Sequence, residues 1–203
     1  MDIHFFFRGL ILGFSIAAPV GPIALLCIRR TLTQGNLSGL ISGLGAATAD
    51  AIYGCIASLG LTFISTILIS QQLWLRLIGG TFLCYLGLKT FVSKPPEQAA
   101  VANSTNLVNA YASTFFLTLT NPLTIISFAA IFAGLGVASS SGNYLSAIIL
   151  VLGVFTGSAL WWLILCSTIS LLRAKLTSGK LKWVNRISGV IIALFGLFSL
   201  LLK

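Results

Sequence analysis

The stretch Ala17–Leu26 reads AAPVGPIALL, and it lies inside an apolar run that extends from about Gly9 to the pair Arg29–Arg30. A run of ~20 apolar residues has the length of a helix that crosses a bilayer. Two prolines and a glycine interrupt this one near its middle. Proline lacks a backbone N–H, so the carbonyl four residues earlier loses its partner. Such a break is tolerated at membrane depth only where protein or a water-filled cavity covers it.

The composition indicates an integral membrane protein. Of the 203 residues, 57% are hydrophobic and 7% are charged, whereas about a quarter of the residues of a soluble domain are charged. Six apolar segments of spanning length are predicted, at about 9–28, 38–62, 74–93, 110–134, 146–170 and 184–202. We therefore expect an all-α protein whose residues 1–203 form a single membrane domain, with no room for a soluble one.

The basic residues predict the orientation of the chain. Nine of the 12 Lys and Arg residues fall in or beside the odd-numbered loops: Arg29, Arg30, Lys89, Lys94, Arg173, Lys175, Lys180, Lys182 and Arg186. Cytoplasmic loops carry such an excess, so we expect both termini on the extracytoplasmic side of a bacterial inner or plasma membrane. The first apolar run is expected to be retained rather than cleaved as a signal. Charges placed beside spans do not indicate nucleic-acid binding.

The segment 94–109, KPPEQAAVANSTNLVN, is predicted to be a cytoplasmic linker between two halves, at about 1–93 and 110–203. Each half has three expected helices, so the second half enters the membrane from the opposite side. Related halves would form an inverted repeat, a recurrent transporter design. In support, the expected fourth helix is interrupted at Thr120, Asn121 and Pro122, as the first is at Pro19, Gly21 and Pro22.

Both breaks create new helix starts near the middle of the membrane. Each lies about ten residues into its segment, which is ~15 Å at 1.5 Å per residue. Gly21–Pro22 and Asn121–Pro122 suit the cap and the first turn of a helix. Such a start presents free N–H groups that attract an anion such as a carboxylate. The alternative is a pair of plain proline kinks that neighbouring helices repair.

Asp50 is the second signal, because the other two acids, Asp2 and Glu97, lie outside the expected spans. It belongs to a stripe of small residues at helical spacing: Gly39, Gly43, Ala46, Ala47, Gly54 and Ala57. Such a stripe normally packs against another helix, so Asp50 should face the bundle interior. There it could exchange a proton or neutralise an ammonium group. The alternative is a structural Asp that caps freed backbone groups.

Other residues carry less information. Trp161 is expected deep in its span, where it either lines a cavity or packs in the core. Cys27, Cys55, Cys84 and Cys166 read as small packing residues. The sequence contains no catalytic triad, no metal-ligand spacing and no phosphate-binding loop. We therefore expect neither an enzyme nor a cofactor or metal site.

Six segments together resemble the LysE-type family of bacterial amino-acid exporters: PVGPIALLCIRRTLTQG, GLISGLGAATADAIYG, GGTFLCYLGLKTF, TLTNPLTIISF, GVFTGSALWW and RISGVIIALFGLFSL. They cover nearly the whole chain in order. The resemblance implies six helices in two inverted halves, and proton-driven export of small amino acids or related compounds. It also implies that the first Pro/Gly motif, Asp50 and Asn121–Pro122 lie on the pathway. Two departures leave the substrate open: Pro-Val-Gly-Pro replaces a tighter Pro-Gly-Pro, and Leu123 stands where many members have Lys.

The resulting hypothesis is alternating access around one midplane site that binds a small amino acid. One rival is an exporter of metal or inorganic ions, which would need more acids or histidines in the spans. A second is a membrane thiol-redox carrier, which needs a cysteine in each broken helix, whereas the sequence supplies only Cys27. A third is a purely structural scaffold. The sequence does not decide between a monomer and a homodimer.

Overall fold

The computed structural model describes residues 3–19, 21–58, 71–92, 106–121, 124–128, 144–173 and 178–201. Within these ranges the chain is all-helical, without strands. The helices are α1 (Ile3–Ala17), α2 (Pro22–Gln34), α3 (Asn36–Ser58), α5 (Gln72–Val92), α6 (Leu107–Leu119), α8 (Tyr144–Arg173) and α9 (Ser178–Leu201). Residues 124–128 form one further short helix.

Four of the described helices are long and apolar enough to cross a membrane, namely α3, α5, α8 and α9, and the bent pair α1–α2 makes a fifth candidate span. Large apolar side chains are exposed on several of them, for example Ile11, Leu88, Leu152 and Phe198. Such surfaces suit contact with lipid. The chain is therefore a multi-pass membrane protein. Most of the expected span 110–134 is represented by α6 and residues 124–128, and the rest of it lies outside the described residues.

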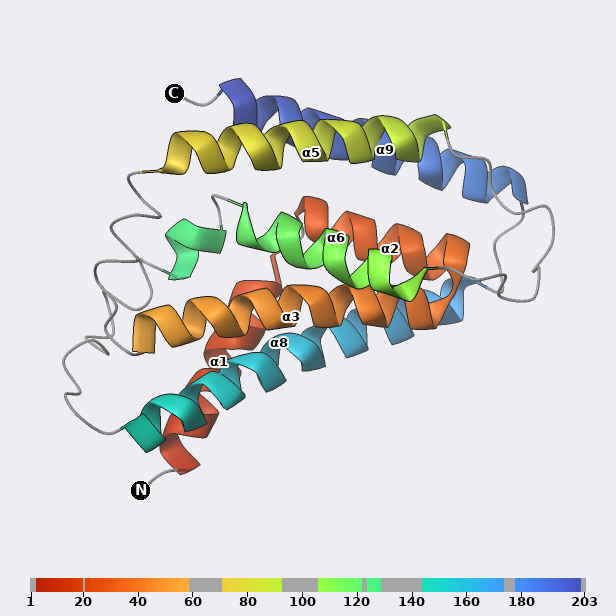
Figure 1. The fold of residues 1–203 in the computed structure, drawn as a ribbon. Coiled ribbons are helices and arrows are strands. Elements are labelled where there is room, and N and C mark those ends of the chain that lie inside the picture. Colours follow the sequence, from red (N-terminus) through yellow and green to blue (C-terminus); the bar gives the residue numbers. More distant parts are fainter. Residues whose placement is uncertain are drawn as a thin grey trace.

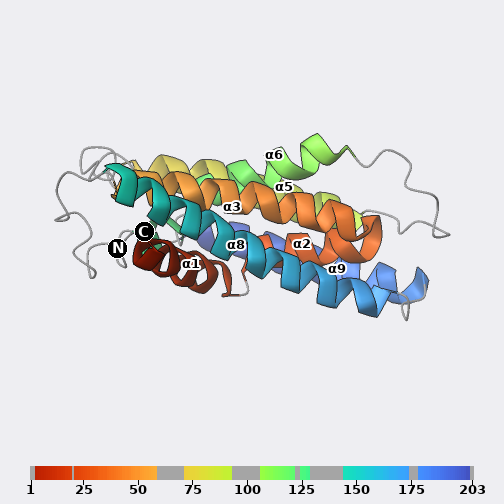
Figure 2. The ribbon, with the colours of Figure 1, turned by 90° about the horizontal axis from the view of Figure 1, so that it is seen from below.

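The helices pack in pairs along a common direction (Figures 1 and 2). Helix α1 lies along α8, α3 packs on both α6 and α8, and α5 pairs with α9. The start of α1 and the end of α9 lie at the same end of the bundle (Figure 1). From there, α1 and α2 lead toward the opposite end, whereas α6 starts at that opposite end and runs back toward the middle of the bundle (Figure 1).

The first expected span is broken where the sequence predicts it. Helices α1 and α2 meet at an angle of 81°. Gly21 is the N-cap of α2 in an extended conformation (φ −121°, ψ −167°), and Pro22 follows in the first turn. Proline is suited to that position because its missing N–H would have no partner there. Helix α2 ends at Gly35, whose positive φ of 106° favours glycine.

Small residues of α3 let it pack closely against its neighbours. A Cβ at Gly39 would overlap the hydroxyl of Thr31, and one at Gly45 would overlap the carbonyl oxygen of Tyr111 in α6. A Cβ at Gly43 would collide with Trp162 in α8. The stripe of small residues therefore packs against other helices, as its spacing indicated.

Arg30 corrects one detail of the sequence analysis, which assigned the pair Arg29–Arg30 to a loop. Helix α2 continues to Gln34, and Arg30 lies buried within it with 8% of its surface exposed. Its Nη1 donates to Ser42 Oγ (2.8 Å) in α3, and to the Ala110 carbonyl (2.9 Å) and Thr114 Oγ1 (2.8 Å) in α6. Its Nη2 donates to Ser113 Oγ (2.7 Å). One guanidinium thus connects three helices.

We expect Arg30→Lys to lower the free energy of unfolding by about 1–3 kcal/mol, because an ammonium group lacks the planar fork that reaches acceptors on both α3 and α6. Thermal unfolding of the purified protein in detergent measures this change. Arg8→Lys is the matched control, because Arg8 is exposed on α1. Equal midpoints for wild type and both variants would mean that the Arg30 hydrogen bonds contribute nothing to stability.

Candidate functional site

A cavity of about 70 Å³ lies where the two interrupted segments meet. At ~10–15 Å³ per water, it has room for several water molecules or a small solute. Its lining comes from the α1–α2 break, α3, the end of α6, residues 124–128 and α8: Ile16, Ala17, Pro19, Gly21, Pro22, Ile23, Ala24, Ala46, Asp50, Thr118, Asn121, Thr124, Ser127 and Trp162. Five sequence-predicted site residues thus share one cavity: Pro19, Gly21, Pro22, Asp50 and Asn121.

Asp50 is the acidic group of this cavity. Only 3% of its surface is exposed, and its Oδ2 accepts a hydrogen bond of 2.7 Å from Ser158 Oγ in α8. The described lining contains no Lys, Arg or His. A buried carboxyl without a basic partner in its lining is costly, and such groups usually serve a function at membrane depth. Asp50 is therefore placed to meet a cation or a proton that enters the cavity.

The start of α2 supplies the opposite chemistry. Backbone N–H groups in the first turn of a helix have no intrahelical acceptor, and Ile23 and Ala24 of this turn line the cavity. The next N–H, of Leu25, already donates to the Gly21 carbonyl at 3.1 Å. The dipole of α2 adds partial positive charge at the same end. One wall of the cavity is thus suited to an anion.

The second break is organised around Asn121. Its Nδ2 donates to Thr124 Oγ1 (3.0 Å), and its carbonyl accepts from the N–H of Ile125 (3.2 Å). The Thr118 carbonyl, which Pro122 was expected to free, accepts from the Asn121 N–H at 3.2 Å. This hydrogen bond satisfies the carbonyl locally. Pro122 itself lies outside the described residues.

Two predicted residues are not among those that line the cavity. Thr120 lies at the end of α6 beside Gly79 of α5, and its hydroxyl donates to the Phe116 carbonyl at 2.8 Å. Trp161 packs edge-on against Phe14 of α1, with ring centroids 5.3 Å apart. The geometry therefore favours the core-packing interpretation of Trp161.

Sequence reasoning missed several polar residues and one aromatic residue at this cavity. Thr118, Thr124, Ser127 and Trp162 line it, and Ser158 donates a hydrogen bond to Asp50. Short hydroxyl side chains are common in membrane helices, where they bond to backbone carbonyls, so their presence gives little signal. Ser158 becomes recognisable only through its partner Asp50, which is far away in sequence.

The described residues offer no site for a metal ion, because no three His, Cys, Asp or Glu side chains gather within them. Cys27 and Cys166 are both buried and free. The polar groups of the cavity are one carboxyl, an exposed helix start, an amide and several hydroxyls. They suit a small solute that carries both signs of charge.

Membrane-length helices around a small polar cavity, with a broken helix at its wall, are the architecture of a membrane transport protein. The LysE type translocator family model matches residues 14–203. The chain belongs to this family, whose members are transporters rather than enzymes.

Named relatives agree with this assignment. A Bacillus subtilis (strain 168) protein named as a putative amino acid efflux protein, YcgF, is 29% identical over 199 residues, which cover 96% of this chain and 94% of the relative. The threonine efflux protein of Salmonella typhi is 24% identical over 193 residues, with 87% and 88% covered. The uncharacterized membrane protein YrhP of B. subtilis is 26% identical over 189 residues, with 87% and 89% covered. No solved structure gives a significant match.

Proposed function

We propose that the protein exports a small amino acid through the cavity beside Asp50. The substrate carboxylate binds at the start of α2 and near Asn121, and Asp50 either meets the substrate ammonium or carries the counter-moving proton. The observation that carries the proposal is the shared cavity, in which a helix start and a carboxyl face the same small volume. An amino acid is the common metabolite that presents a carboxylate and an ammonium so close together.

Alternating access is the proposed transport mechanism, with the two halves of the chain related as an inverted repeat. The packing supports this. Helix α1 of the first half packs on α8 of the second, and α6 of the second half packs on α3 of the first. The symmetry that relates the two halves would place α5 where α9 lies and α9 where α5 lies. These two helices pack on each other. Rocking of such halves would expose a central site to each side in turn.

We further propose that the proton gradient drives export and that both termini face outward. The excess of Lys and Arg at the end of the bundle where α2, α5 and α8 finish supports a cytoplasmic assignment for that end. A carboxyl in the lining of the cavity is a suitable carrier of the driving proton. Amino acids would then load from the cytoplasm as protons enter from outside.

Transport by purified protein in liposomes tests the proposal. Vesicles loaded with labelled threonine are diluted into medium with an imposed pH gradient, and loss of the label is followed; threonine comes first because one relative is named for its efflux. We expect efflux that is faster with the gradient than without it, and that is inhibited by unlabelled small amino acids. Protein-free vesicles are the control. If no amino acid in a full panel leaves faster than from protein-free vesicles, the proposal is wrong.

A further inference from the structure

Trp162 has an unusual place in the structure. Only 4% of its surface is exposed, and it lines the Asp50 cavity. Its indole Nε1 is buried and has no hydrogen-bond partner among the described residues. An indole N–H can only donate, and a buried one usually has a partner. Among the described residues this donor is therefore open to an acceptor on a bound solute.

Trp162 lies on the same face of α8 as the partner of Asp50. It lies one helical turn after Ser158, the hydroxyl partner of Asp50. Side chains of a helix lean toward its N-terminus, so the indole covers the turn that contains Ser158. Gly43 in α3 makes the room, because a Cβ there would collide with the Trp162 side chain. Trp162 and Asp50 thus both belong to the wall of this cavity.

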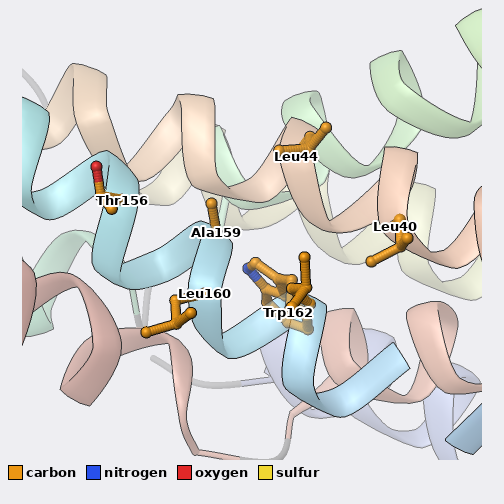
Figure 3. Close-up of a pocket in the computed structure, with 7 residues that line it drawn as sticks. Leu40, Leu44, Thr156, Ala159, Leu160 and Trp162 are labelled. Atoms are coloured by element: carbon orange, nitrogen blue, oxygen red, sulfur yellow. The ribbon is translucent and has the colours of Figure 1, made fainter. Parts of the chain in front are cut away.

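The other side of Trp162 borders an apolar groove of about 290 Å³ between α3 and α8 (Figure 3). In that view the indole nitrogen lies at the end of the ring nearer Ala159 and farther from Leu40 (Figure 3). Apart from Trp162, the groove is lined by Leu40, Leu44, Thr156, Ala159, Leu160 and Leu163. Trp162 is the residue that the linings of the groove and the cavity share. Its ring therefore separates a small polar volume from a larger apolar one.

We propose that Trp162 determines substrate specificity, as a donor to the substrate carboxylate and as the wall that excludes large side chains. This inference rests on the proposed function. The carboxylate has enough lone pairs to accept from the indole as well as from the start of α2. The substrate class that follows is zwitterionic amino acids with small side chains. Removal of the ring would join the cavity to the groove and admit branched or aromatic side chains.

Two substitutions separate the two roles. Trp162→Phe removes the N–H but keeps most of the ring, so we expect the KM for small amino acids to rise about tenfold or more with side-chain preference unchanged. Trp162→Ala removes the wall, so we expect leucine and phenylalanine to compete with the small substrate at least as well as alanine does. Trp161→Phe is the matched control, because the Nε1 of Trp161 is also buried without a partner among the described residues, whereas its ring packs on Phe14.

The measurement is labelled amino-acid transport in proteoliposomes, with competition by glycine, alanine, serine, threonine, leucine and phenylalanine. The inference is wrong if Trp162→Phe keeps the wild-type KM, or if a folded Trp162→Ala still prefers small amino acids. If Trp162→Ala does not fold, the KM of Trp162→Phe alone tests the inference. Failure of the proposed function is distinguishable, because then the wild-type protein itself transports no amino acid.

Discussion

Asp50→Asn is expected to reduce gradient-driven amino-acid export about 100-fold. The substitution keeps the size of the side chain and an oxygen that can accept the hydrogen bond from Ser158. It removes the negative charge that would meet an ammonium and the carboxyl that would carry a proton. Loss of one partner from a buried charged interaction typically costs 2–5 kcal/mol, and 100-fold corresponds to ~2.7 kcal/mol.

A second assay distinguishes the two roles proposed for Asp50. In exchange between labelled and unlabelled amino acid, no net proton movement is needed. If Asp50 only carries the proton, Asp50→Asn retains exchange and loses gradient-driven export; if Asp50 meets the ammonium, both are lost. Asp2→Asn is the matched control, because it makes the same change outside the expected spans. Export by Asp50→Asn at the wild-type rate at every pH would exclude both roles.

Gly157→Leu is expected to prevent α1 and α8 from packing and to abolish the yield of folded protein. Gly9 and Gly13 of α1 meet Gly153 and Gly157 of α8, and a Cβ at any of these four positions would overlap a backbone carbonyl oxygen of the opposite helix. Glycines spaced by four residues allow helix backbones in a membrane to approach closely. A backbone atom cannot move aside as the end of a side chain can, so the helices must separate.

The smaller change Gly157→Ala should lower stability by about 1–3 kcal/mol, the usual cost of an overfilled core. Size-exclusion chromatography in detergent measures the yield of folded protein for both variants. Thermal unfolding in detergent measures their stability. Gly179→Ala and Gly54→Ala serve as matched controls. An added Cβ meets nothing within 4 Å at Gly179, and at Gly54 it meets Val154 at an ordinary 3.6 Å. If Gly157→Ala unfolds at the wild-type temperature, close packing of α1 on α8 is not needed.

The sequence predicted features that depend on covalent chemistry or on local periodicity. Proline interrupts a helix because it lacks the N–H, so Pro22 was enough to predict the position of the α1–α2 break. The interior position of Asp50 followed from the spacing of the small residues around it. Most expected spans agree with described helices to within a few residues. The larger differences are at helix ends. Helix α1 begins earlier and α2 ends later than the expected 9–28, and α9 begins at Ser178 rather than at about 184.

Features that depend on distant partners could not be predicted. Arg30 was expected in a loop because positive charge usually stays outside the membrane, but acceptors on α3 and α6 hold it inside the protein. Trp161 was the tryptophan named as a candidate for the cavity, whereas its neighbour in sequence, Trp162, lines it. The rotation of α8 about its axis decides between them, and that rotation is set by contacts with α1 and α3.

The central claim is that the transported amino acid occupies the cavity beside Asp50, and thiol modification of a cavity residue tests it most directly. Ser127→Cys places a thiol in the lining, in a background where the partly exposed Cys55 and Cys84 are replaced by Ala. We predict that an exported amino acid slows modification of this cysteine by a small thiol reagent. If Asp50 meets the substrate ammonium, Asp50→Asn weakens this protection. An amino acid that is exported by the Ser127→Cys protein, yet leaves its modification rate unchanged at saturating concentration, would contradict the account.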